Sequence, residues 1–171
     1  MRIREATYSD IDAIAALYDD AREALKNAGV DQWQKDGPNI DTAFADVEDG
    51  ICYVVTDAEG LVAVFICDFS GEPAYQSILD GEWLSNGEYA ALHRVAVSSR
   101  HKGHGVGSEI IAFIAGRCNE NEVTSIRCDT HRDNKPMQRL LEKNGFIRCG
   151  KVYYWDCGER IAFEKILSES E

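Results

Sequence analysis

The chain has 171 residues, of which 44% are hydrophobic and 28% are charged, and its formal net charge at pH 7 is −12. This length and composition are typical of one α/β or α+β domain with a sizeable core, so we expect a single domain over residues 1–171. The acidic balance argues against a nucleic-acid partner, because no basic face is present to neutralise phosphates. A cationic substrate suits the acidic balance better.

Hydropathy and cysteine spacing exclude further classes. No apolar run approaches the roughly twenty residues that span a bilayer, and the first residues alternate in polarity without a hydrophobic signal region. The six cysteines are scattered singly inside apolar patterns, without the paired spacing of a metal site. We therefore expect no membrane partner, no metal site, a cytoplasmic location and buried free thiols.

The N-terminal third predicts a strand followed by two helices. Residues 2–6 alternate, and Ser9 is expected to cap a helix whose apolar residues repeat at three and four as far as Leu25. A loop containing Trp33 follows, and then a short helix over residues 40–48. Two interpretations of Trp33 carry equal weight: it seals the edge of the core, or it forms a wall of the substrate pocket.

Two strands and a long irregular segment come next. Residues 51–56 and 61–69 are β-branched or aromatic runs joined by a turn, in which Gly60 is expected at a positive φ. Residues 70–87 have no regular pattern, and irregular segments of this length are often functional lids. Four side chains of this part are candidate substrate contacts, although edge packing or a solvated loop explains them as well: Asp68, Glu72, Tyr75 and Trp83.

The segment from Leu92 to Gly116 predicts a strand, a glycine-rich turn and an amphipathic helix. Gly103, Gly105 and Gly107 can adopt positive φ and let successive backbone N–H groups point at an anion above the helix N-terminus. Arg100 and Lys102 add positive charge at the same place. We expect this turn to bind a pyrophosphate.

The rest of the chain predicts a strand at residues 123–128, a helix that begins near Pro136 and ends at Asn144-Gly145, and two strands at residues 146–154 and 160–167. The element order is therefore β, α, α, β, β, β, α, β, α, β, β. Three consecutive strands before the glycine turn indicate an antiparallel section, and the β-α-β units after it indicate parallel strands. The expected fold is a mixed sheet with helices on both faces.

Three kinds of anion-binding loop can be compared with the glycine turn. A P-loop requires Lys-Ser or Lys-Thr after the glycines, and a dinucleotide fingerprint requires a different glycine spacing near the first β-α unit. Neither fits. The run Arg100-His-Lys-Gly103-His-Gly105 resembles the acyl-coenzyme A loop of the GNAT superfamily, and residues 134–146, from an Asn that opens a helix to a closing Gly-Phe, resemble its second signature.

This resemblance implies a GNAT-like α/β fold, a mixed sheet with a V-shaped splay between its fourth and fifth strands. It implies an N-acetyltransferase that passes an acetyl group from acetyl-CoA, by direct attack, to a primary amine of a small molecule or protein. The C-terminal strands are a candidate homodimer surface. The residues expected to bind the cofactor are Val95, Val97, Arg100, Lys102, Gly103, His104, Gly105, Gly107, Ser108 and Asn134.

Catalysis needs a base, and two histidines are candidates. His93 shares the strand parity of Val95 and Val97 and is the first choice, while His131, after the next strand, is the second. A buried or turn histidine with a structural role is the alternative for each. Many members of the superfamily carry a tyrosine acid where this chain has Leu141, which leaves open a non-catalytic acyl-CoA-binding regulatory module.

The acid for the leaving thiolate is correspondingly open. Tyr153 and Cys149 are candidates by their place in the implied fold, and a thiolate can also depart without help because of its modest pKa. The sequence does not identify the amine.

Overall fold

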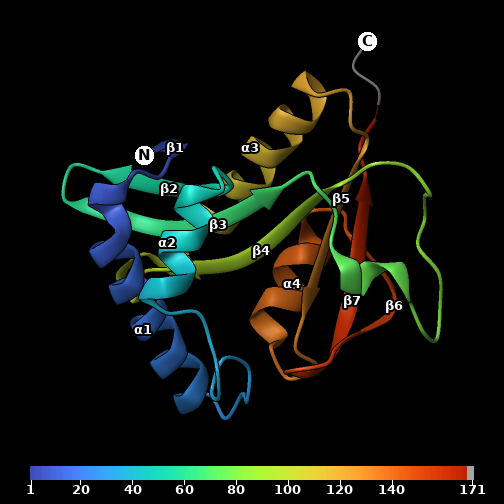
Figure 1. Cartoon of the computed structure of the whole chain (residues 1–171), viewed down its shortest axis with the longest axis horizontal. Coiled ribbons are helices and arrows are strands. Elements are labelled where there is room, and N and C mark those ends of the chain that lie inside the picture. The colour runs from blue at the N-terminus through green and yellow to red at the C-terminus, as the bar shows by residue number, and fades with distance from the viewer. Residues whose placement is uncertain (169–171) are drawn as a thin grey trace. The chain divides into compact units, whose positions relative to one another are not determined.

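The computed structural model describes residues 1–168, and its elements follow the predicted order (Figure 1). Seven strands and four α-helices are found in this range. The strands are β1 (Arg2–Glu5), β2 (Cys52–Asp57), β3 (Gly60–Asp68), β4 (Ala90–Val97), β5 (Ser125–Thr130), β6 (Ile147–Tyr154) and β7 (Gly158–Ile166). The helices are α1 (Ile11–Asn27), α2 (Ile40–Glu48), α3 (Val106–Glu120) and α4 (Lys135–Lys143), with short 3₁₀ helices η1 (Tyr8–Asp10), η2 (Pro73–Gln76) and η3 (Ser99–His101).

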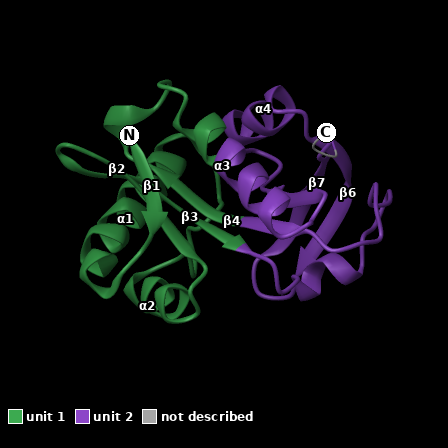
Figure 2. Ribbon diagram, turned by 90° about the horizontal axis from the view of Figure 1, so that it is seen from above, with its two compact units in different colours: residues 1–67, 93–110 green, residues 68–92, 111–171 purple. Residues whose placement is uncertain are grey.

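The chain forms two compact units, shown in different colours in Figure 2. The first contains residues 1–67 and 93–110, and the second contains residues 68–92 and 111–171. Both β4 and α3 therefore contribute to each unit. No helix in the described range is long and apolar enough to cross a membrane.

Strand pairing confirms the predicted mixed sheet. The hydrogen-bonded order is β1-β2-β3-β4-β5-β7-β6. In the first unit β1, β2 and β3 are antiparallel. In the second, Ala90–Leu92 of β4 pair in parallel with Ile126–Cys128 of β5, and β7 is antiparallel to both β5 and β6. The switch from antiparallel to parallel pairing thus occurs at β4, where the sequence predicted it.

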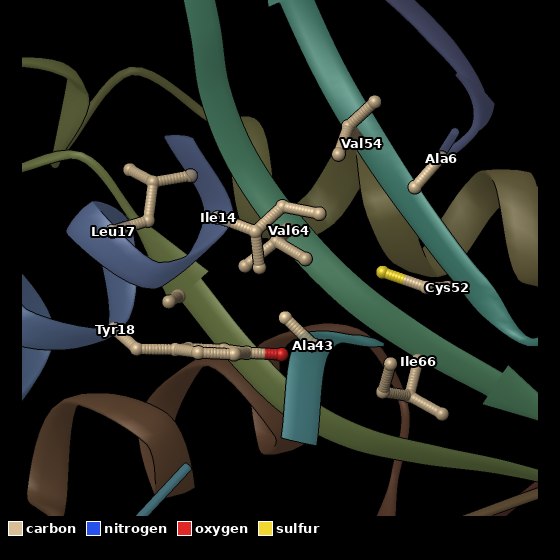
Figure 3. Packing of buried hydrophobic residues seen from close by; sticks show 10 residues of the cluster. Ala6, Ile14, Leu17, Tyr18, Ala43, Cys52, Val54, Val64 and Ile66 are labelled. Carbon is tan, nitrogen blue, oxygen red and sulfur yellow. The ribbon is translucent and has the colours of Figure 1, made fainter. Parts of the chain in front are cut away.

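The core of the first unit lies between α1, α2 and the strands (Figure 3). Ile14 and Tyr18 are four residues apart on one face of α1, and both are fully buried against Val64 and the other residues of the cluster. Burying each such side chain stabilises the fold by about 1.5–3 kcal/mol. Trp33 packs at the edge of this cluster, where its ring meets Tyr18 edge-on with centroids 5.8 Å apart.

Two details of the sequence analysis are corrected. The N-cap of α1 is Asp10, one residue after the expected Ser9, because a 3₁₀ turn capped by Thr7 precedes α1. The backbone N–H of Thr7 donates to Asp10 at 2.8 Å in the capping box of that turn. All six cysteines are free, but Cys157 is exposed because it lies in the turn between β6 and β7. The other five are buried, as predicted.

Candidate functional site

The glycine-rich turn between β4 and α3 belongs to the first unit. Gly103 and Gly105 both have φ of 80°, the left-handed region that side-chain-bearing residues rarely adopt. A Cβ built on either residue would meet no atom within 4 Å. The two glycines are therefore required by their backbone conformation, and the space beside them is open to a ligand.

The turn is fixed to the rest of its unit by side chains and backbone. The N–H of Ser98 donates to the Val62 carbonyl of β3 at 2.8 Å. Ser99 donates its N–H and its hydroxyl to the Asp20 carboxylate of α1, at 3.0 and 3.1 Å. The His101 Nε2 atom lies 3.2 Å from the Asp57 carboxylate. Hydrogen bonds to this carboxylate lower the pKa of Asp57. These contacts fix the position of the turn within its unit.

The start of α3 provides hydrogen-bond donors. The N–H of Glu109 makes the first helical hydrogen bond, to the Gly105 carbonyl at 3.1 Å. The amides of Val106 and Gly107 come before it and have no helical acceptor, since the first turn of a helix has none. The helix dipole and the exposed Arg100 and Lys102 add positive potential. This donor set suits a polyphosphate such as that of coenzyme A.

The strand before the turn is irregular at Arg94, whose φ is 45°. Its guanidinium makes a two-point ion pair with Asp46 of α2, with distances of 2.7 and 2.9 Å. His93 lies close enough for its charge to act on Asp46. A left-handed residue next to His93 interrupts strand alternation, so the parity argument does not fix which face His93 occupies. Val95 and Val97 lie beyond it, half-buried.

In the second unit, His131 and Asn134 shape the turn between β5 and α4. The N–H of Asp133 donates to His131 Nδ1 at 3.0 Å. Asn134 caps α4 by accepting the N–H of Met137 at 3.2 Å. Gln138, which is buried on α4, donates to the carbonyls of His131 and Arg132. Both predicted site residues thus belong to a turn held by hydrogen bonds.

Two predicted substrate carboxylates form local hydrogen bonds in the second unit. Asp68 accepts the N–H and hydroxyl of Ser70 at 2.9 and 2.7 Å. Glu72 accepts the N–H of Ala74 at 3.2 Å and caps η2. Both are half-buried. The solvated-loop alternative accounts for these contacts, and a role in substrate binding stays a prediction.

The segment with Tyr75 and Trp83 is attached to the sheet. Tyr75 is 2% exposed and packs against Trp83, with ring centroids 5.1 Å apart. The indole N–H of Trp83 donates to the Tyr75 carbonyl at 2.8 Å. Leu79 and Lys151 of β6 exchange two backbone hydrogen bonds of 2.8 Å. These contacts match the edge-packing interpretation of the two aromatic residues.

The sequence analysis missed two clusters in the second unit. Tyr75 and Tyr154 both donate their hydroxyls to Asp129 of β5 at 2.6 Å. On the same strand, Arg127 pairs with the fully buried Glu164 of β7 at 3.3 Å. Arg127 and Asp129 are two residues apart, so strand alternation could have predicted that they share a face. Their partners are 25 to 54 residues away, and nothing local predicts them.

Cys149 and Tyr153 are the two predicted candidates for protonating the leaving thiolate, and Leu141 stands where the resemblance implies a tyrosine. Leu141 is fully buried in α4, so its position contributes packing and no acid. Cys149 is 8% exposed, and burial raises the pKa of its thiol. Tyr153 is 61% exposed on β6.

Comparisons with known proteins agree with this fold. The model of the "Acetyltransferase (GNAT) family" matches residues 14–146. The uncharacterized N-acetyltransferase YesJ of Bacillus subtilis is 28% identical over 145 residues, which are 82% of this chain and 78% of YesJ. The crystal structure of a GNAT family acetyltransferase from Streptococcus agalactiae is 33% identical, with a TM-score of 0.88 over 98% of this chain and 95% of that one.

A more distant structure shows the fold alone. The GNAT family acetyltransferase from Listeria monocytogenes is 22% identical, with a TM-score of 0.76 over 97% of this chain and 94% of its own. The fold therefore persists where most residues differ.

Proposed function

The chain belongs to the GNAT acetyltransferase family and is an N-acetyltransferase that uses acetyl-CoA, and we propose that it acetylates a primary amine of a small molecule or a protein by direct attack. Family membership decides against the non-catalytic alternative. The observation that carries the proposal is the glycine turn before α3, with its two left-handed glycines and open space beside them. The family model runs through residues of both units, which supports their acting as one acetyltransferase domain.

We propose that this turn binds the pyrophosphate of the cofactor. The amides between Arg100 and Ser108 would donate to phosphate oxygens, and Arg100 and Lys102 would add charge. His104 lies exposed within the same turn and would neighbour the phosphates. Val95 and Val97 would offer backbone groups to the pantetheine arm, and Asn134 would contribute an amide. When bound, acetyl-CoA supplies an activated thioester carbonyl.

Catalysis by this chain's residues requires a base and an oxyanion donor. We assign the base to His93, with His131 as the second candidate, and the oxyanion donor to the backbone N–H near Val95. Leu141 cannot protonate a thiolate, since it has no titratable group. Unaided departure of the thiolate accounts for the reaction without a dedicated acid, because a thiol is a weakly basic leaving group.

A matched pair of glycine variants tests the loop. Gly105→Ala forces a left-handed alanine beside the ligand and is expected to weaken acetyl-CoA binding at least tenfold. Gly116→Ala adds the same methyl group inside α3, where its Cβ also meets no atom within 4 Å and φ is not positive, and should leave affinity unchanged. Isothermal titration calorimetry measures both. Equal affinities for the two variants would remove the loop from the cofactor site.

The reaction is tested by thiol release from acetyl-CoA with a panel of primary amines. Release that depends on the amine supports the proposal, whereas cofactor binding without turnover for any amine would contradict it. His93→Ala should lower kcat with an unchanged KM for acetyl-CoA. An unchanged kcat would exclude His93 as the base. His131→Ala would then test the second candidate in the same assay.

Two broader expectations stay predictions. β6 ends the strand order and exposes Ile147 and Tyr153, which supports a homodimer through the C-terminal strands. Size-exclusion chromatography with light scattering measures the oligomeric state, and a monomer at micromolar concentration would contradict the homodimer. The free state of all six cysteines fits a reducing compartment such as the cytoplasm.

A further inference from the structure

Asp129, near the end of β5, is held by two phenols. Tyr75 of η2 and Tyr154 of β6 both donate their hydroxyls to its Oδ2 atom, each at 2.6 Å. The three residues come from separate elements of the second unit. Two short hydrogen bonds on one oxygen fix the orientation of the carboxylate and leave Oδ1 for another donor.

The partners of Asp129 differ from those of the buried carboxylates. Asp10, Asp46 and Glu164 are each less than 9% exposed, and each pairs with an arginine, at 2.7, 2.7 and 3.3 Å respectively. Asp129 is half-buried, yet within residues 1–168 its hydrogen-bond partners are neutral phenols and no cationic side chain pairs with it. A partly desolvated carboxylate in this state is a strong acceptor for a cation from outside.

The nearest arginine on the same strand face is already engaged. Arg127 donates to Glu164 and to the Ser85 carbonyl, at 3.3 and 2.7 Å. Its guanidinium also lies 4.2 Å from the ring centroid of Trp83 and 4.3 Å from that of Tyr89. It therefore cannot turn to Asp129 without leaving two hydrogen bonds and two ring contacts.

The phenols do not neutralise the site. Burial and then the charge of Asp129 raise the pKa of both Tyr75 and Tyr154, so both hydroxyls stay protonated as donors. Glu72, Cys128 and Cys157 are titratable groups coupled to this cluster, and none of these three is cationic. The cluster thus carries a net negative charge and a rigid acceptor with aromatic neighbours.

We propose that Asp129 binds the cationic nitrogen of the acceptor, an alkylammonium ion, with Tyr75 and Tyr154 as positioning residues that fix its carboxylate. The assignment rests on the proposed function, since an acceptor amine is cationic before it loses a proton. An ammonium would donate to Oδ1 in a charge-assisted hydrogen bond.

Binding of pentylammonium to the full chain in the presence of coenzyme A tests the site, by ligand-observed NMR. Uncharged 1-pentanol serves as the matched ligand and is expected to bind at least tenfold more weakly. Asp129→Asn keeps shape and removes charge, so the Kd for pentylammonium should rise roughly ten- to hundredfold, the range for one charge-assisted hydrogen bond. Tyr154→Phe keeps the charge of Asp129 and should raise the Kd for pentylammonium only a few-fold.

Asp80→Asn is the control, because it removes the same charge from a side chain that is 74% exposed in the same unit. Wild-type affinity in Asp129→Asn, or equal weakening in Asp80→Asn, would overturn the proposal. Thermal midpoints verify that the variants fold. If Asp129→Asn does not fold, Tyr75→Phe and Tyr154→Phe replace it, and unchanged affinity for pentylammonium in both would overturn the proposal.

Thiol release separates this proposal from the proposed function. If wild-type protein acetylates pentylamine and Asp129→Asn does so with the same KM, the ammonium site is wrong and the function stands. If pentylammonium binds through Asp129 and no amine releases thiol, the function is wrong and the site stands.

Discussion

Each unit contains a buried carboxylate paired with an arginine, and the pKa shifts of these two carboxylates have opposite signs. In the first unit, Arg94 donates twice to Asp46, yet burial raises the pKa of Asp46 above its ordinary value because it outweighs the arginine. In the second, burial also opposes the charge of Glu164, but the pKa of that carboxyl is lowered. The arginine is common to both, so it does not explain the difference.

Neutral donors explain it. Glu164 accepts the N–H of Leu84 at 2.7 Å and the hydroxyls of Ser85 and Ser125 at 2.6 Å, in addition to Arg127. Within residues 1–168 the Asp46 carboxylate accepts hydrogen bonds from Arg94 alone, and the Arg94 side chain is 30% exposed. A buried carboxylate stays charged when several donors replace its lost hydration, and one arginine is not enough.

The largest expected effect is that of Glu164→Gln. The substitution leaves Arg127 buried without its counter-charge and disrupts the hydrogen bonds of Ser85 and Ser125, so we expect a loss of about 3–5 kcal/mol in the free energy of unfolding. Urea denaturation followed by circular dichroism measures it. Glu159→Gln on the same strand removes an exposed carboxylate and should change stability by less than about 0.5 kcal/mol. A loss below about 1 kcal/mol in Glu164→Gln would contradict the comparison.

Removal of one neutral donor should have an intermediate effect. Ser125 is 1% exposed and donates to Glu164. Ser125→Ala is therefore expected to cost about 1.5–3 kcal/mol, the range for a hydrogen bond to a charged group. Ser77→Ala, at an exposed serine of the same unit, is the matched control for urea denaturation. If both variants unfold at the same urea concentration, neutral donors do not stabilise Glu164.

Local sequence patterns were sufficient for the elements and for the glycine turn. All seven strands and four α-helices were predicted in order, because periodicity, turn glycines and caps act over a few residues. The positive φ of Gly103 and Gly105 was predicted for the same reason, whereas Gly107, grouped with them, lies in α3 and its φ is not positive. The left-handed Arg94 was not, because arginine has no preference for that conformation and Asp46, 48 residues away, holds its side chain.

Long-range polar contacts could not be read from the sequence. Asp46 lies in the short helix predicted over residues 40–48, and that prediction did not indicate that it is buried. Arg127 lies between buried strand residues, and a charge in that context predicts a buried partner without identifying Glu164. The hydrogen bond from the Tyr75 hydroxyl to Asp129, 54 residues away, was not predicted. These contacts depend on how the strands are paired, which local patterns do not encode.

The contributions of Glu164 and Asp46 to stability should change with pH in opposite directions. Glu164 has a lowered folded-state pKa, so its contribution is present above its ordinary pKa of 4.5 and is lost as the pH falls through the folded-state value. Asp46 has a raised pKa, so its contribution is present below its ordinary value of 3.8 and is lost as the pH rises through the folded-state value. Unfolding free energies between pH 3 and pH 7 test this. The penalty of Glu164→Gln should grow with pH, and that of Asp46→Asn should shrink.

Asp46→Asn should have the smallest effect at pH 7. The ionised carboxylate is destabilised more by burial than it is stabilised by Arg94, and an asparagine oxygen can still accept from a guanidinium that is partly exposed. We expect a loss of about 1 kcal/mol or less, and a double-mutant cycle with Arg94→Ala measures the coupling between the two residues. A coupling energy between Asp46 and Arg94 as large as the stability loss in Glu164→Gln would contradict the comparison. One arginine would then stabilise a buried carboxylate as well as an arginine and three neutral donors do.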